Sequence, residues 1–233
     1  MKRFILILTL LFAQCALAQK PAFYYTYNSE SHFSYAKTSF MNQSTNLKNK
    51  VRFSYLPNLN LLFNLDFNKR FGVASGISLE NTGLIYVDSI KNKHRSLTLG
   101  VPIQLNFCFG EDKLWKITGG YEPDLYFHYK NKRFLNNTKY KTAEYFSPKT
   151  VANGSGIFCS LGYKANYLRI KYRLNDFFDA NYSQIQPNGS VFMPYLGSQS
   201  KIIYIAIGSY HAFGRHKPRN FNGIKPKKII TQN

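Results

Sequence analysis

Apolar and polar residues alternate with a period of two along most of this chain. The clearest segment runs from Trp115 to Tyr129, where the odd positions are mostly apolar and the even positions mostly polar. A period of two is typical of a β-strand with one apolar and one polar face. The same pattern predicts eight strands, at residues 22–28, 51–67, 71–80, 96–107, 115–129, 156–163, 168–175 and 201–213.

The connections between these segments alternate in length. Short turns are expected at 68–70, 110–112 and 164–165, and long loops at 29–50, 88–95, 130–150 and 176–200. Aromatic residues flank the short turns on the apolar face, namely Phe67, Phe71, Phe107, Trp115 and Tyr163. Others are expected near the opposite rim, namely Phe53, Tyr55, Phe127 and Tyr129. Long strands, alternating loop lengths and two aromatic girdles are typical of outer-membrane barrels. We therefore predict an all-β, eight-stranded antiparallel up-and-down transmembrane β-barrel.

The two ends of the chain have their own character. Lys2 and Arg3, the apolar run from Phe4 to Phe12 and the small residues before Gln19 predict a signal peptide over 1–18. The barrel is predicted over 19–214 and a basic, disordered tail over 215–233, with docking of the tail as the alternative. An even number of strands places both termini in the periplasm of a Gram-negative bacterium, with the barrel in its outer membrane.

The charge balance is strongly basic. The formal charge is +20, and loss of Lys2 and Arg3 with the signal peptide leaves +18. A secreted protein rarely meets nucleic acid, so we expect no nucleic-acid partner and take anionic lipid as the partner. Cys108 and Cys159 fall on opposite faces of strands that are not neighbours, so no disulfide is expected between them. No Cys or His spacing indicates a metal site, and no cofactor is expected.

The polar faces of the predicted strands carry charges of both signs. An eight-stranded barrel has an interior just wide enough for side chains to fill. Because buried charges must be paired, these residues predict an internal ion-pair network that plugs the lumen. The residues predicted to form this structural network are Asp66, Glu80, Glu122, Asp124, Arg169, Lys171 and Arg173. A solute channel is the alternative.

Two other classes of protein fit the pattern less well. A lipid hydrolase with its site at the barrel rim would draw on His94, His128, Ser96 or Ser89, with Glu122 or Asp124 as the acid. No nucleophile motif surrounds these serines, so we expect no catalytic residues. A secreted soluble binding barrel would show the same alternation with its apolar faces turned inward.

The predicted loops carry many cations. Residues 88–95 hold Lys91, Lys93, His94 and Arg95. Residues 130–150 hold Lys130, Lys132, Arg133, Lys139, Lys141 and Lys149 against Glu144. Cations at the outer rim can contact the phosphates of lipopolysaccharide. The alternative is that they are solvated loop charges.

The fourth and fifth predicted strands carry a family resemblance. Leu97, the stretch from Val101 through Pro102 to Leu105, Phe109-Gly110 and the stretch from Lys116 to Tyr121 resemble the PorT-like outer-membrane β-barrel proteins of Bacteroidota. The resemblance covers roughly residues 50–214 and rests on short motifs. It implies an eight-stranded barrel and, for some members, a role in protein secretion. A secretion-machinery component or another membrane protein is therefore a candidate partner. The residues after Phe213 depart from the usual barrel, which ends at a terminal aromatic residue.

Overall fold

The computed structural model describes residues 21–41, 47–110, 114–135 and 138–213. The predicted signal peptide and basic tail lie outside these residues, so both stay predictions. Within the described residues, no helix is long and apolar enough to cross a membrane.

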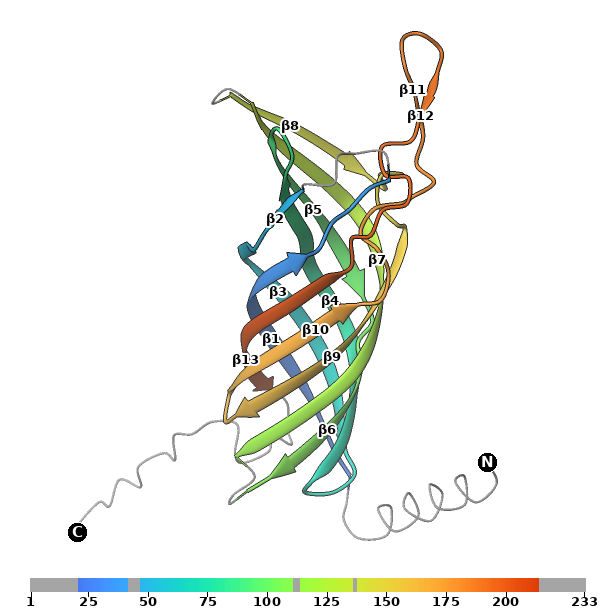
Figure 1. Ribbon diagram of the computed structural model, residues 1–233. Helices are drawn as coiled ribbons and strands as arrows, with labels where there is room; N and C mark the ends of the chain where they lie inside the picture. The colour runs from blue at the N-terminus through green and yellow to red at the C-terminus, as the bar shows by residue number, and fades with distance from the viewer. Residues whose placement is uncertain (1–20, 42–46, 111–113, 136–137, 214–233) are drawn as a thin grey trace, which may run out of the picture.

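Eight antiparallel strands close into one ring (Figure 1). In ring order they are β1 (Ala22–Ala36), β3 (Arg52–Asp66), β4 (Phe71–Val87), β5 (Lys91–Gly100) continued by β6 (Ile103–Phe109), β7 (Trp115–Leu135), β9 (Asn153–Tyr163), β10 (Asn166–Arg173) and β13 (Ile202–Phe213). Pairing of β13 with β1 closes the barrel. The prediction of an eight-stranded antiparallel barrel is confirmed.

Four short strands extend one end of the barrel, which we call the loop end (Figure 1). β2 (Lys48–Lys50) pairs with the end of β4, and β8 (Thr138–Tyr145) pairs with the end of β7. β11 (Gln184–Ile185) and β12 (Val191–Phe192) form a separate hairpin within the β10–β13 connection. The opposite end, which we call the turn end, carries the connections β3–β4, β6–β7 and β9–β10.

Three of the predicted long loops are shorter than the sequence indicated, because the strands continue past the apolar segments. β1 reaches Ala36, β4 and β5 meet across residues 88–90, and β7 continues to Leu135 before β8. One predicted strand is interrupted. β5 and β6 are separated at Val101 and Pro102, because proline has no N–H to donate to the ladder.

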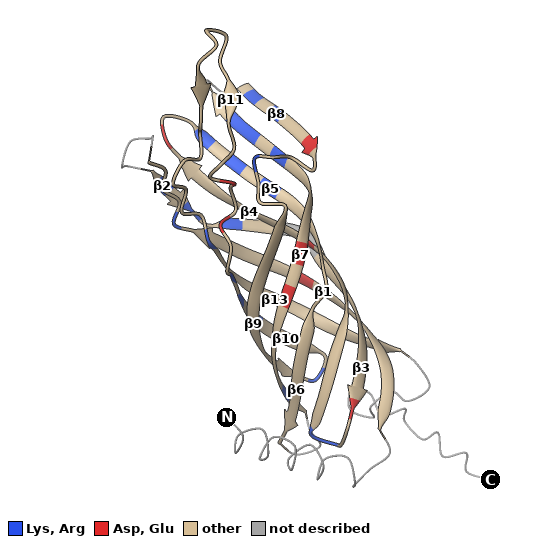
Figure 2. Cartoon of the chain, turned by 90° about the vertical axis from the view of Figure 1, so that its right-hand side faces the viewer, with Lys and Arg blue, Asp and Glu red and all other residues tan. Residues whose placement is uncertain are grey.

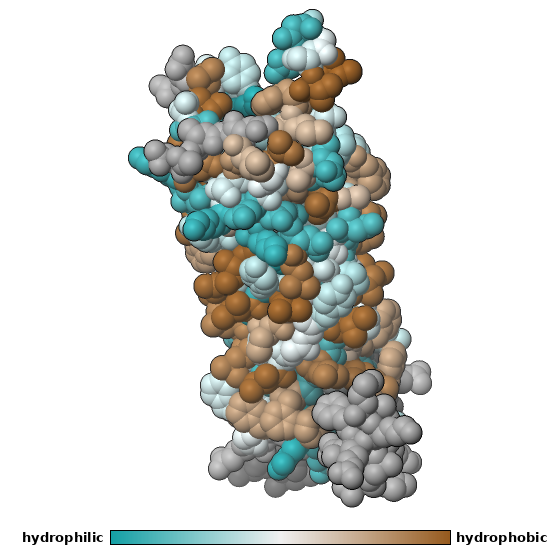
Figure 3. Space-filling view, turned by 45° about the vertical axis from the view of Figure 1, so that its right-hand side comes forward, coloured by the Kyte–Doolittle hydropathy of each residue, from teal (hydrophilic) through white to brown (hydrophobic). Residues whose placement is uncertain are grey.

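The barrel wall is apolar outside and polar inside. On β10, Leu168, Ile170 and Tyr172 are exposed, whereas Arg169, Lys171 and Arg173 are buried. Figure 3 shows brown hydrophobic surface along the barrel, below a hydrophilic band near the loop end. This orientation is the reverse of the one that a soluble barrel with an apolar interior requires.

Aromatic side chains surround the turn end on the outside. Phe71 packs on Phe107 and Trp115 on Tyr163, each with ring centroids 4.9 Å apart. At the other rim, Phe53 is exposed as expected, whereas the side chain of Tyr55 lies outside the described residues.

The expectation that Tyr129 faces outward is wrong, because its side chain is only 1% exposed. The register of β5 on β7 shifts between Leu97 and Thr98, whose partners are His128 and Tyr126. Phe127 is therefore an extra residue, a β-bulge that reverses the alternation beyond it. Past the bulge the odd residues of β7 face inward and the even residues face outward.

Candidate functional site

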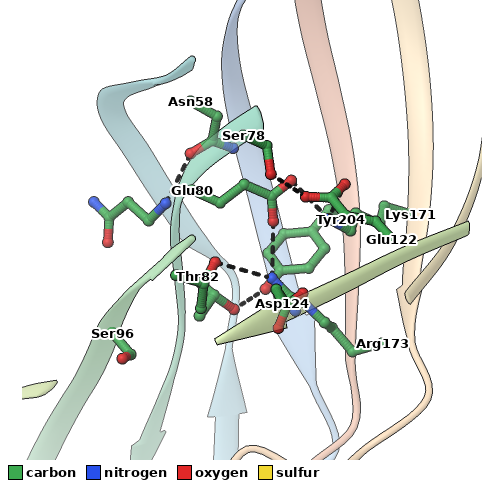
Figure 4. Close-up of polar contacts among 12 residues, drawn as sticks. Asn58, Ser78, Glu80, Thr82, Ser96, Glu122, Asp124, Lys171, Arg173 and Tyr204 are labelled. Atoms are coloured by element: carbon green, nitrogen blue, oxygen red, sulfur yellow. Dashed lines mark hydrogen bonds and ion pairs between the residues drawn. The ribbon is translucent and has the colours of Figure 1, made fainter. Parts of the chain in front are cut away.

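A cluster of buried ion pairs joins several strands inside the barrel (Figure 4). Lys171 Nζ donates to Glu80 Oε1 at 2.7 Å and to Glu122 Oε2 at 2.8 Å. Arg173 pairs with Glu80 Oε2 at 2.8 Å and also with Asp124. β4 and β10 lie on opposite sides of the ring, so these contacts join strands across the lumen.

The alternation of β10 explains how one strand supplies the cations. Arg169, Lys171 and Arg173 are two residues apart, so they project to the same face at intervals of about 6.6 Å. Ser78 and Thr98 add polar contacts to Glu122 and Arg173. A buried charge that lacks its partner is strongly destabilising, so this network favours a single arrangement of the facing strands.

Arg169 has a partner that the sequence did not indicate. Its guanidinium lies 2.5 Å from Glu30 Oε1, and both side chains are buried. Tyr167 donates to the same oxygen at 2.7 Å and Asn60 donates to it at 3.3 Å. Glu30 falls within the predicted loop 29–50, because its neighbours Ser29 and Ser31 make both faces of the strand polar there.

Asp66, which is predicted to belong to the lumen network, lies apart from these ion pairs. It is the last residue of β3, at the turn end, and accepts a long hydrogen bond of 3.5 Å from the Tyr24 hydroxyl. The sequence identified which residues face the lumen but not their depth along the barrel axis, which separates Asp66 from the other carboxylates.

Aromatic residues fill the lumen at the loop end. Phe177 and Phe178, from the β10–β13 connection, are each 1% exposed and turn into the barrel mouth. Phe178 stacks on Tyr195, with centroids 4.3 Å apart, and meets the edge of His94 at 4.9 Å. This cluster lies above the ion pairs, so the described side chains occupy the lumen at two levels.

Three of the candidate hydrolase residues, Ser96, His94 and His128, have other partners in the structure. The Ser96 hydroxyl donates to the backbone carbonyl of His128 at 3.0 Å. His94 is buried with Nδ1 2.7 Å from the Tyr129 hydroxyl, and the ring of His128 packs on Tyr145. The two candidate acids, Glu122 and Asp124, are held in the lumen ion pairs. Among the described residues, no group of His, Cys, Asp and Glu is placed to hold a metal ion.

Lys and Arg positions gather at the loop end, around β5 and β8 (Figure 2). We call cationic strip the outward residues Lys93, Arg95, Lys130, Lys132 and Lys141. The strand register puts Arg95 opposite Lys130, and Lys132 opposite both Lys93 and Lys141. Like charges directly opposite each other in a sheet are destabilising.

None of the described acidic residues forms an ion pair with the cationic strip. The ion pair found on this rim joins Glu144 to Lys149, outside the strip. Burial raises the pKa of Glu144, but hydrogen bonds from Lys149 and Ser147 outweigh it and hold the pKa below its ordinary value. This carboxylate therefore stays with Lys149.

Comparison with known proteins identifies similar folds. No protein-family model matches this chain, and no curated protein sequence matches it. The structure is similar to that of Ail, the attachment invasion locus protein of Yersinia pestis, with 12% identity, 82% of this chain and 99% of Ail covered, and a TM-score of 0.39. It is also similar to Neisserial surface protein A, with 10% identity, coverage of 84% and 100%, and a TM-score of 0.35. The resemblance to PorT-like barrels stays a prediction.

Proposed function

We propose that this chain is a closed outer-membrane barrel of a Gram-negative bacterium that binds the phosphates of lipopolysaccharide at its outer rim. The membrane location is supported by the apolar outer face and by the aromatic girdle at the turn end. A plugged lumen is supported by the buried ion pairs and by the aromatic cluster above them. A binding or structural role suits such a barrel better than solute transport.

The register of the cationic strip carries the proposal for the ligand. Lys132 faces Lys93 on one side and Lys141 on the other, so three ammonium groups lie in one row across three strands. This row is unfavourable in the free protein, and an anion that contacts several of its members would stabilise it. Multivalent phosphate groups meet this need, because each can accept hydrogen bonds from more than one cation.

The position of the strip points to a lipid source for the phosphates. Arg95 is followed on the same outward face of β5 by Leu97 and Leu99, so the cations begin where the apolar face ends. A rise of about 3.3 Å per residue puts Arg95 about 13 Å from Leu99, which is the scale of an interfacial layer. Phosphates of a lipid in the outer leaflet would lie at this level.

Binding of purified lipopolysaccharide to the detergent-solubilised barrel tests the proposal. The triple variant Lys93→Gln/Lys132→Gln/Lys141→Gln should bind at least tenfold more weakly than the unmodified barrel, and dephosphorylated lipopolysaccharide should bind equally weakly to both. Lys201→Gln is the matched control, because Lys201 is an exposed lysine next to β13, away from the strip. The strip is ruled out as a phosphate site if the control loses as much affinity as the triple variant, or if dephosphorylation of the lipopolysaccharide does not change its affinity.

The same proposal fixes the orientation of the barrel, with the loop end outside the cell and both termini in the periplasm. In a background with Cys108 and Cys159 changed to Ser, a cysteine at Lys139 should react with an impermeant reagent on intact cells. A cysteine at Lys69, in the β3–β4 turn, should react only after lysis. The reverse pattern of labelling would invert the orientation.

The β11–β12 hairpin supports a second role, as a docking element for a protein partner. Ile185 and Val191 face each other in its ladder and are 80% and 65% exposed. Two large aliphatic side chains on a projecting hairpin are costly in water unless a partner covers them. A secretion-machinery component or another membrane protein is the partner that the PorT-like resemblance implies. Cross-linking from the hairpin in cells, lost in Ile185→Ser/Val191→Ser, is the expected result; a pattern unchanged in that variant counts against docking.

A further inference from the structure

A cavity of about 440 Å³ lies at the loop end, on the inner side of β7 and β8. Small-molecule sites commonly have volumes of about 300–1,000 Å³. The β7–β8 hairpin forms one wall, and the β10–β13 connection forms the other with Tyr182 and Tyr195. The cavity is separate from the lumen ion pairs and from the cationic strip.

The bulge at Phe127 places polar groups of β7 in this cavity. Because the alternation is reversed beyond the bulge, Asn131 and Arg133 face inward while Lys130 and Lys132 face outward. Asn131 is 5% exposed, and its side-chain oxygen Oδ1 is buried without a hydrogen-bond partner in the structure. A buried acceptor without a donor is costly, so a rotation of the Asn131 carboxamide that brings this oxygen to the cavity wall and to a ligand hydroxyl would be favourable.

The uncompensated positive charge at the cavity fits a ligand with one negative charge. Arg133 and Lys149 both line the cavity. Lys149 is already paired with Glu144, whereas the described acidic residues give Arg133 no ion pair. One uncompensated guanidinium matches a single carboxylate, which it can bind through two parallel hydrogen bonds.

Aromatic rings supply the remaining surface. Tyr129, Tyr140 and Tyr182 line the cavity, and the ammonium of Lys149 lies 6.0 Å from the ring centroids of Tyr129 and Tyr182. Tyrosine combines an apolar ring face with a hydroxyl, which suits a ligand that has both C–H faces and hydroxyl groups. A sugar ring has these features.

We propose that this cavity binds an acidic sugar of the uronic-acid class. The carboxylate pairs with Arg133, a ring hydroxyl donates to Asn131 Oδ1, and the tyrosines pack against the sugar ring. The proposal does not depend on phosphate binding by the strip, because its residues face the other side of β7.

Calorimetry with galacturonic acid on the detergent-solubilised barrel tests the proposal. Galacturonic acid should bind at least tenfold more tightly than galactose, which lacks the charge, and than inorganic phosphate, which lacks the ring. If galactose binds as tightly as galacturonic acid, Arg133 does not bind a carboxylate and the proposal is wrong. Equal binding of phosphate would reduce the cavity to a simple anion site and overturn the sugar assignment.

Two variants on exposed side chains avoid damage to the fold. Arg133→Gln should weaken binding of galacturonic acid about tenfold and remove the preference over galactose, and Tyr140→Ala should weaken both sugars. Lys201→Gln, which removes the same charge elsewhere, should leave both affinities unchanged. If the control and Arg133→Gln lose affinity equally, the effect is general electrostatics and the site is wrong.

Competition identifies the source of the sugar. If lipopolysaccharide from the native bacterium displaces galacturonic acid, the natural ligand is an acidic sugar of the surrounding membrane. If only soluble oligogalacturonate displaces it, the ligand is a free glycan. If neither displaces it, the cavity does not accept an acidic sugar within a larger glycan, which contradicts the proposal.

Discussion

The lumen network makes a quantitative prediction for Lys171. Its ammonium group lies 2.7 Å from Glu80 and 2.8 Å from Glu122, and the three side chains are 3%, 5% and 1% exposed. At these distances and an effective dielectric constant of about 20, each contact is worth about 6 kcal/mol before desolvation. Glu80 retains Arg173 when Lys171 is removed, whereas Glu122 keeps the hydrogen bond from the Ser78 hydroxyl but has no second ion pair among the described residues.

Lys171→Met should therefore lower the free energy of unfolding by about 3–5 kcal/mol, the usual cost of an uncompensated buried charge. The double variant Lys171→Met/Glu122→Gln should recover at least about 2 kcal/mol of this loss, because it removes the unpaired carboxylate. Lys201→Met serves as the control for losing a lysine at an exposed site.

Urea titration in detergent, followed by the fluorescence of Trp115, measures these differences, since Trp115 is the single tryptophan of the chain. The heat-modifiable gel shift provides an independent measure of the folded barrel. A single variant within about 1 kcal/mol of the unmodified barrel, or a double variant no more stable than the single one, would refute the reasoning.

Three further results are expected. Ile103, on the lipid-facing side of β6, is 57% exposed. In lipid vesicles, Ile103→Arg should lower the free energy of unfolding by about 2–4 kcal/mol, whereas Ile103→Leu should leave it nearly unchanged. Equal effects of the two substitutions would place this face outside the lipid. Because the pKa of Glu144 is held below its ordinary value, its pair with Lys149 stabilises the segment after β8 above the ordinary carboxyl pKa and is lost as the pH falls through the depressed pKa. Hydrogen exchange of residues 144–149 should accelerate in acid, and Glu144→Gln should remove this dependence; an acid response that persists in the variant would point to another group. Planar bilayers containing the barrel should show no stable conductance steps, since the lumen side chains are buried, and regular single-channel steps would contradict a plugged lumen.

The alternation of residue types predicted the number of strands and the face of each charge on β10. The prediction succeeds because one face of each strand contacts lipid and the other faces the lumen, so neighbouring residues must differ in polarity. The same rule loses its signal beyond the apolar belt, where both faces meet water. β1 illustrates the loss: Asn28 to His32 are polar on both faces, so the strand and its lumen residue Glu30 could not be recognised.

The pairing of the lumen charges could not be predicted from the sequence, for a different reason. Alternation says which side chains enter the lumen, but the depth of each depends on the register between strands that are distant in the chain. Glu80 and Arg173 meet because their strands face each other across the ring, whereas Asp66 lies at the turn end. A list of inward charges therefore gives the members of a network without its contacts.

The bulge at Phe127 is the feature that separates the two candidate binding surfaces. Before it, β7 presents apolar odd residues such as Leu125 to the outside; beyond it, the even residues Lys130 and Lys132 take that side. If the same sequence paired regularly through Phe127, with no bulge, Asn131 and Arg133 would face outward, and Lys130 and Lys132 would enter the barrel mouth. The bulge thus turns the lysines to the outer face of the barrel and the amide and guanidinium toward the cavity. Because adjacent residues of β7 face opposite sides, substitutions one position apart should alter the proposed lipopolysaccharide binding and the proposed sugar binding independently.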